Sequence, residues 1–597
     1  MTRLAGVAAA LVAYTVVGAL TGAVRHADEH AGEARAVVEL VIDAGKRVGR
    51  VRPMWDEVNL WKLQSFFGID RPDPARWWGP RWMARHAPWA RYARLLAAVG
   101  GNYASAIAPW CDHALVVPEH PDTGTGECGR GGTPGAAART ELIREADGRT
   151  VTDYGPFRVA IGRVLTSGVL PHLNLSAAPA PFTGGATDFS HYHWNAAPVR
   201  DLAGWSAFIG DALRAVADLA PHEWRVSITN EPNCLTLVGW QQEIRHVGFA
   251  GTPEDYARMF VTGAAAIEQA APGVHLHAGN YVTSVTFPAE DNLRLYLGAL
   301  RDGLHADGRI RWDDLWAISL SLYETPDTSL YDFVPVRLAR LETAVRTVGL
   351  TPRPIKVDEL DLHPTIVDAF RREAAEPLDR TLYAASWHAE TLRAFIEAGT
   401  VVSVAPWLTR MFDLGAFAPY PKARTYELFG MLAGQLRRAS PLGEAPAELT
   451  GRGGGLPRLA ITGESPPAGA RPLHPRRGTR LGALATRGPD GVRIVVVHHQ
   501  NMPVADGSLR QRRLARRVRV LVRDLPSGAY EIRHTSLDAE GGAWNGTTTP
   551  LVWRNGGCRR AQNGVIEVTP ARRIDANSVW MFEAIRRRRC PGEPVPR

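Results

Sequence analysis

Two glutamates in this sequence each close a short β-rich run and together offer the groups that cleave a glycosidic bond. Glu231 follows the run 224–229 and precedes Pro232, and Glu359 lies in the run 354–360. Glycoside cleavage needs an acid that protonates the leaving oxygen and a second carboxylate that attacks the anomeric carbon. One glutamate at a strand end is usually a surface or ion-paired residue, but two at separate strand ends favour a catalytic pair.

The surrounding residues suggest a role for each carboxylate. We expect Glu231 to be the general acid/base and Glu359 the nucleophile of a retaining mechanism. Asn230 is placed to hydrogen-bond a sugar hydroxyl beside the reacting carbon. Strand alternation should direct only one of Asp358 and Glu359 inward, and we expect Glu359 to be that one. This chemistry needs no metal and no organic cofactor.

The elements that must position these groups alternate between strand and helix from residue 51 to about 440. Strands are expected at residues 51–61, 102–108, 171–177, 224–231, 274–280, 315–323, 354–360 and 401–408. Helices are expected at residues 89–99, 202–219, 253–271, 336–348, 382–398 and 422–437. The pattern favours a (β/α)8 TIM barrel over residues 51–440, with a doubly wound open sheet as the alternative. In a barrel, Glu231 and Glu359 end strands four and seven on the catalytic face.

The segments on either side of this region have a different composition and a different pattern of apolar residues. Residues 441–597 begin with Gly/Pro/Arg-rich loops and continue as short strands without long helical patterns, which predicts an all-β sandwich. Its strands are expected at residues 492–498, 518–522, 530–534, 565–568 and 579–583. Residues 25–50 include an apolar run that would add a strand to the sandwich.

Residues 1–24 resemble an export segment. Arg3 precedes an apolar run that extends to residue 24, which is typical of a secretory signal peptide or of a membrane anchor. We therefore expect the protein to be secreted or extracytoplasmic, or to be held at the membrane by this segment.

The five cysteines fit an oxidising compartment. Cys111 and Cys128 bracket a Gly/Pro/Asp-rich loop, and Cys558 and Cys590 lie in the C-terminal region. We expect two disulfides among these four cysteines, with Cys234 left over and the connectivity open. The sequence has no C-x-x-C pair, which argues against a structural zinc site.

Other functional classes have weak support. The G-x-G-x-x-G match at residues 124–129 neither follows a strand nor opens a helix, so a dinucleotide site is not expected. The chain of 597 residues has a formal net charge of +8, and its arginine-rich segments 510–519 and 586–589 read as solvated faces. We expect a carbohydrate partner, an oligo- or polysaccharide, and no nucleic acid.

Taken together, these motifs resemble glycoside hydrolase family 39 of clan A, which holds β-xylosidases and α-L-iduronidases. The resemblance extends from about residue 38 to 584 and rests on residues 168–175, 230–233, 252–256, 314–323 and 527–545. It implies that Tyr323, which closes strand six, contacts the nucleophile. It also implies that Trp407, which closes strand eight, forms a platform under the sugar.

This sequence also departs from the family pattern. Ser321 stands where the family often has a histidine, and strand two ends in Trp110-Cys111-Asp112-His113 instead of Arg-x-His. We expect Trp110 and His113 to line the substrate pocket. The alternatives to a hydrolase are a non-catalytic carbohydrate-binding or envelope protein on the same fold and a transglycosylase that uses the same intermediate.

Overall fold

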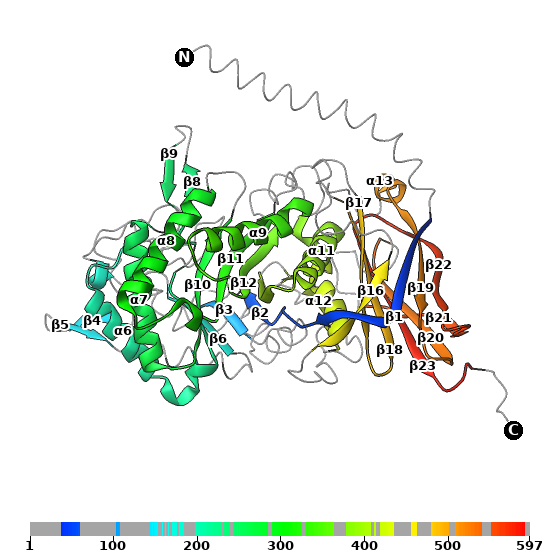
Figure 1. Ribbon diagram of the computed structural model, residues 1–597, viewed down its shortest axis with the longest axis horizontal. Coiled ribbons are helices and arrows are strands. Elements are labelled where there is room, and N and C mark those ends of the chain that lie inside the picture. The colour runs from blue at the N-terminus through cyan, green and yellow to red at the C-terminus, as the bar shows by residue number, and fades with distance from the viewer. Residues whose placement is uncertain are drawn as a thin grey trace, which may run out of the picture.

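The computed structural model describes two large β-sheets, three two-stranded hairpins and the helices that pack on the sheets (Figure 1). With short gaps, the described residues are 37–59, 198–283, 289–362, 378–434, 455–462, 479–500, 508–539 and 551–591, together with isolated stretches between residues 103 and 183. The expected export segment 1–24, the pair Cys111 and Cys128, and Cys234 lie outside these residues.

The first sheet has eight parallel strands that lie side by side in chain order. They are β2 (Glu57–Asn59), β3 (Tyr103–Ile107), β6 (Leu170–Asn174), β7 (Arg225–Ser227), β10 (His275–Val282), β11 (Ala317–Glu324), β12 (Ile355–Leu362) and β13 (Val401–Pro406). This order excludes the doubly wound alternative, in which the strand order reverses at a switch point. The sheet curls until its last strand meets the chain before its first, where Val404 N donates to Met54 O at 2.7 Å.

Helices that follow the strands pack against one another along the chain (Figure 1). They are α6 (Leu202–Arg214), α7 (Pro253–Ala270), α8 (Ala289–Asp307), α9 (Leu330–Thr347), α11 (Leu382–Ala398) and α12 (Pro421–Ala433). Their ends follow from local sequence. For example, α7 starts at a capping box formed by Thr252 and Asp255, with Pro253 in its first turn. Gly399, with φ of 71°, ends α11.

Short elements complete this region. Three two-stranded hairpins pair β4 (Ile143–Ala146) with β5 (Arg149–Thr152), β8 (Leu235–Val238) with β9 (Glu243–His246), and β14 (Phe412–Asp413) with β15 (Ala418–Pro419). A single short helix, α13 (Leu509–Arg513), belongs to the described part of the C-terminal region.

The second sheet is all-β and has nine strands in the order β21-β20-β23-β18-β17-β16-β1-β19-β22. The bounds are β1 (Val37–Val51), β16 (Leu456–Thr462), β17 (Thr479–Arg487), β18 (Gly491–Gln500), β19 (Arg516–Arg523), β20 (Ala529–Leu537), β21 (Arg554–Arg560), β22 (Ile566–Ile574) and β23 (Ser578–Arg587). We expected a sandwich of two sheets. The strands instead form one nearly closed hydrogen-bonded sheet, because β1 pairs antiparallel with β16 and parallel with β19 and so joins the two halves.

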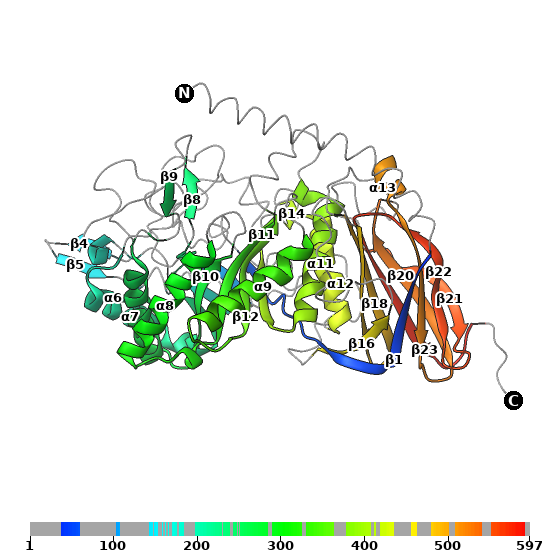
Figure 2. The same cartoon turned by 45° about the horizontal axis from the view of Figure 1, so that its top comes forward.

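Both faces of the middle of this sheet are buried, which explains the unbroken apolar run in β18. Ile494 and Val496 face the core enclosed by the sheet, whereas Val495 and Val497 face the helical side. Figures 1 and 2 place α11 and α12 between the two sheets. Polar contacts add to this packing, since His499 Nδ1 lies 2.8 Å from Ser386 Oγ on α11.

Two further observations concern the C-terminal region and the membrane. Cys558 on β21 and Cys590 beyond β23 form a disulfide with their Cα atoms 5.5 Å apart. Among the described helices, none combines the length and the apolar character needed to cross a membrane.

Candidate active site

Glu231 and Glu359 lie at the carboxyl edge of the parallel sheet, on its fourth and seventh strands. Glu359 belongs to the end of β12 and is 8% exposed, and Glu231 follows β7 and is partly buried. Glu231 has a φ of 45°, a left-handed conformation that is uncommon for a residue with a side chain and that tends to occur at functional sites. The negative charge of Glu231 acts on Glu359, so the two carboxylates are electrostatically coupled.

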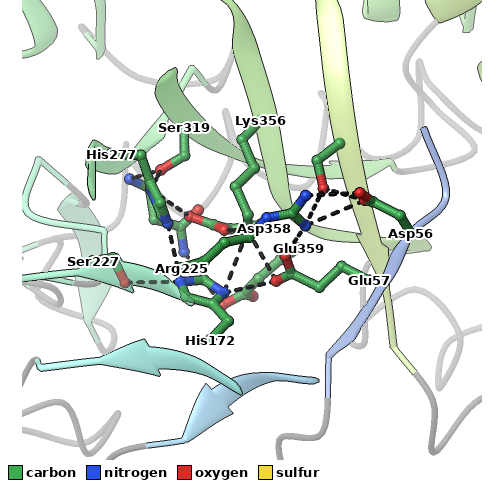
Figure 3. A network of polar contacts seen from close by, with 12 residues as sticks. Asp56, Glu57, His172, Arg225, Ser227, His277, Ser319, Lys356, Asp358 and Glu359 are labelled. Atoms are coloured by element: carbon green, nitrogen blue, oxygen red, sulfur yellow. Dashed lines mark hydrogen bonds and ion pairs between the residues drawn. The ribbon is translucent and has the colours of Figure 1, made fainter. Parts of the chain in front are cut away.

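The end of β12 corrects the expectation from strand alternation. Both Asp358 and Glu359 are buried, and Figure 3 shows both in the polar interior of the sheet. The cause is a β-bulge, because Leu320 pairs with Val357 while Ser321 pairs with Glu359, which leaves Asp358 without an opposite residue. A bulge resets the alternation and can aim consecutive side chains to one side.

Glu359 is held by donors from the two preceding strands. The Tyr323 hydroxyl on β11 donates to Oε2, and Asn280 Nδ2 on β10 lies 3.4 Å from Oε1. Trp407, directly after β13, meets the Tyr323 ring edge to face, with ring centroids 5.8 Å apart. Four of the residues that the sequence singled out therefore come together: Glu231, Glu359, Tyr323 and Trp407.

The surroundings of Glu359 have opposing effects on its pKa. Burial and the Glu231 carboxylate raise the pKa of Glu359 to about 8, while the bonds from Tyr323 and Asn280 favour the ionised form. Two carboxyl groups that interact this strongly titrate as a pair. With its pKa raised in this way, Glu359 is largely protonated near neutral pH in the free protein and must lose that proton before it can act as a nucleophile.

The loop that carries Glu231 is tied to the neighbouring strand by Asn233. The Asn233 side chain donates to Val282 O and accepts from Val282 N, both at 2.9 Å. Asn292 Nδ2 on α8 donates to Asn233 O at 2.6 Å. This pair of hydrogen bonds to the end of β10 fixes the loop that carries Glu231. We had not predicted it from the sequence.

Below the carboxylates, the interior of the sheet holds a network of buried charges (Figure 3). Arg225 on β7 donates to Glu57 at 2.7 Å and to Asp56 at 2.7 Å. Lys356 on β12 donates to Glu57 at 3.0 Å and also contacts Asp358. Burial opposes ionisation of Glu57, but Lys356, His172 and Arg225 hold its pKa well below the usual value, so it is a carboxylate.

The protons of the two histidines in this network can be assigned. Burial and Lys356 lower the pKa of His172 to about 4 and lower the pKa of His277 well below its usual value, so both rings are neutral. His172 Nδ1 lies 2.7 Å from Glu57, which can only accept, so Nδ1 carries the proton. His172 Nε2 then accepts from His277 Nε2 at 3.0 Å. His277 Nδ1 then faces Ser319 Oγ at 3.0 Å, and the Ser319 hydroxyl also donates to Ala278 O at 3.2 Å.

Within the described residues, His172, His277 and Asp358 are the group whose donor atoms lie close enough to share a metal ion, all within 4.8 Å of one another. Their contacts fit a hydrogen-bonded network better. The facing Nε2 atoms of the histidines share a proton, and the Lys356 ammonium contacts Asp358 and would repel a cation.

The other predicted pocket residues have different outcomes. Trp110, His113 and Asn230 lie outside the described residues. Glu57, the first residue of β2, is 1% exposed and belongs to the buried ion network. Asn280 was missed, although the dipeptide Gly279-Asn280 inside a strand is a recognisable signal for a bulge.

Comparison with known proteins supports the fold. No protein-family model matches this sequence, and no curated protein sequence matches it. A monomeric β-xylosidase from Caulobacter crescentus has a similar structure, with a TM-score of 0.59 and 13% identity over 92% of this chain and 100% of that chain. A GH39 enzyme from Xanthomonas axonopodis pv. citri gives a TM-score of 0.58 and 11% identity over 92% and 98% of the two chains. A bacterial orthologue of human α-L-iduronidase gives 0.53 and 13% over 94% and 85%. At these identities the likeness is one of fold, and it covers both sheets.

Proposed function

We propose that this protein is a retaining glycoside hydrolase whose eight parallel strands form a closed (β/α)8 barrel. The observation that carries the proposal is the coupled pair Glu231 and Glu359 at the ends of strands four and seven, with Tyr323 bonded to Glu359. In barrel enzymes the catalytic groups lie at this edge of the strands. The similar solved structures, which include a β-xylosidase and an α-L-iduronidase orthologue, support the same conclusion.

The proposed reaction has two displacements. In the first, Glu359 Oε attacks the anomeric carbon, the glycosidic C–O bond breaks, and Glu231 gives its proton to the leaving oxygen. In the second, Glu231, now a carboxylate, takes a proton from water, whose oxygen attacks the anomeric carbon and releases Glu359. The anomeric configuration is retained because the carbon is inverted twice.

The substrate class is proposed from the expected location of the protein. An export segment at residues 1–24 would place the enzyme outside the cytoplasm, either secreted or held at the membrane by that segment. Glycans of the cell envelope or of the extracellular medium would then be its substrates. Fractionation of cells that express the full chain tests this, and recovery from the cytosol with reduced cysteines would contradict it.

Product stereochemistry with azide tests the two roles. Glu231→Ala lacks the proton donor, so hydrolysis of natural glycosides should fall by about 10²–10⁴-fold. A dinitrophenyl glycoside needs no acid for its first step, so the intermediate should accumulate, and azide should release it as a glycosyl azide of retained configuration. In Glu359→Ala, azide can enter only from the vacated face and should give the opposite anomer.

The outcomes separate the candidate functions. Swapped stereochemistry would reverse the role assignment. Wild-type binding of oligosaccharides without turnover of any aryl glycoside would support a carbohydrate-binding protein instead. Transfer of the sugar to an added acceptor in preference to water would identify a transglycosylase. A carboxylate separation near 8 Å or more, instead of the roughly 5–5.5 Å of retaining enzymes, would contradict retention.

A further inference from the structure

Strand β10 contains a second bulge, next to the nucleophile. Gly279 pairs with Ser319 and Tyr281 with Leu320 on β11, which leaves Asn280 without an opposite residue. Both bulge residues have left-handed backbones, with φ of 98° at Gly279 and 68° at Asn280. A Cβ at position 279 would lie 2.3 Å from the Tyr281 ring, so glycine is required there.

The two bulges flank the same strand from opposite sides. β11 lies between β10, which bulges at Asn280, and β12, which bulges at Asp358. Bulges re-aim side chains and are enriched beside active sites. Here they bring Asn280 and Glu359, which come from strands that are not adjacent, to within 3.4 Å across β11.

Two serines of β11 fix both the backbone and the side chain of Asn280. The backbone N of Asn280 donates to Ser319 Oγ at 2.6 Å, and the Ser321 hydroxyl donates to Asn280 Oδ1 at 2.8 Å. Because Ser321 engages the amide oxygen, the amide NH₂ must face Glu359. The side chains of Asn280 and Ser321 are 1% and 2% exposed, so water does not compete for these bonds.

We propose that Asn280 is a positioning residue that holds the nucleophile Glu359 in its attacking orientation and in its ionised form, and that Ser321 sets the direction of the Asn280 amide. The proposal rests on the proposed function, because it assumes that Glu359 is the nucleophile. Tyr323 and Asn280 then act as two donors on the two oxygens of one carboxylate, one on each.

The anchor of Asn280 continues into the buried network. Ser319, which accepts from the Asn280 backbone, also places its Oγ 3.0 Å from Nδ1 of His277, whose ring bonds His172 and through it Glu57. The charged and titratable groups that act on Glu359 are Glu231 after β7, Tyr323 on β11 and Lys356 on β12. Of these, Lys356 and Tyr323 favour the carboxylate and Glu231 opposes it, so loss of the Asn280 donor should favour protonation.

Asn280→Gly and Asn280→Asp test the proposal together. Glycine tolerates the left-handed backbone at this position, so Asn280→Gly removes the side chain and keeps the bulge. With an aryl glycoside that the wild type hydrolyses, we expect the acidic limb of the kcat/KM profile to move upward by about one pH unit, since this is one bond to a charged group. Asn280→Asp is isosteric but places a second carboxylate against Glu359, so its activity at pH 8 should fall well below that of Asn280→Gly. Ser321→Ala should shift the limb in the same direction as Asn280→Gly.

A merely structural role predicts a different result. If Asn280 only maintains the bulge, Asn280→Gly should keep both the rate and the acidic limb of the wild type, and that result overturns the proposal. A second readout needs no substrate. The effect of Glu359→Gln on the thermal midpoint is measured against pH, once in the wild type and once in the Asn280→Gly variant. In the Asn280→Gly variant this effect should continue to grow to a higher pH. Glu359→Gln by itself separates the two proposals. If it keeps full turnover, the proposed function fails, whereas an inactive Glu359→Gln with an unshifted Asn280→Gly profile refutes only this inference.

Discussion

Replacement of Glu359 by glutamine should make the protein more stable at pH 8, although it removes the proposed nucleophile. Burial and the Glu231 charge raise the pKa of Glu359 from 4.5 to about 8. A group whose pKa is raised on folding binds more protons in the folded state than in the unfolded state. Stability is therefore unaffected below about pH 4.5, declines as the pH rises, and reaches its full loss above about pH 8.

The structure sets the size of this effect. A shift from 4.5 to about 8 corresponds to a ceiling of about 5 kcal/mol at about 1.4 kcal/mol per pH unit. Glu231 shares the proton with Glu359, so the part that belongs to Glu359 alone is smaller, about 2–4 kcal/mol. At about 2 °C per kcal/mol for a large domain, Glu359→Gln should raise the thermal midpoint of the barrel by about 4–8 °C at pH 8.

The assay compares thermal midpoints of the wild type and the variant between pH 4 and pH 8.5. The gain should be near zero at pH 4 and should grow steadily to pH 8. Glu427→Gln is the matched control, because burial also raises the pKa of Glu427 to about 7, but Arg424 donates to it at 2.7 and 3.0 Å. Glutamine there leaves a buried arginine unpaired and should destabilise the protein. A gain for Glu359→Gln that does not depend on pH, or a loss at pH 8, would refute the reasoning.

Three further predictions concern the groups around the carboxylates. Lys356→Met, which removes a fully buried cation from Glu57, should lower stability by about 3–5 kcal/mol in denaturant titrations. Gly279→Ala should lower both the thermal midpoint and kcat, because its Cβ would overlap the Tyr281 ring at a φ of 98°; equal midpoints would contradict this. Tyr323→Phe should reduce kcat/KM by about 10–100-fold, which corresponds to the loss of one hydrogen bond to a charged group. An unchanged kcat/KM would show that the Tyr323 hydroxyl does not contribute to catalysis.

The sequence by itself indicated where the two proposed catalytic carboxylates lie in the fold. Glu231 and Glu359 each close a β-rich run, and in a parallel sheet all such ends lie on one edge, so their proximity followed from local pattern. Seven of the eight parallel strands were expected within about four residues of their observed bounds, because strand and helix periodicities differ clearly along this part of the chain. The first, expected at residues 51–61, is the shorter β2 (Glu57–Asn59), and residue 51 instead ends β1 of the other sheet. The strands β16, β17 and β21 were missed, since β16 and β17 adjoin Gly- and Arg-rich stretches that read as linker and β21 is polar.

Only the tertiary structure decided how the site is held. Alternation within β12 would direct Asp358 away from Glu359, and the bulge that brings both inward depends on pairing with β11, a strand more than thirty residues away in sequence. The same holds for Asn280, whose direction toward Glu359 depends on the register across β11. It also holds for Lys356, whose burial is tolerated because Glu57 and Asp358 lie beside it. Register and charge pairing are properties of neighbours that folding brings together, so a local pattern of residue types cannot specify them.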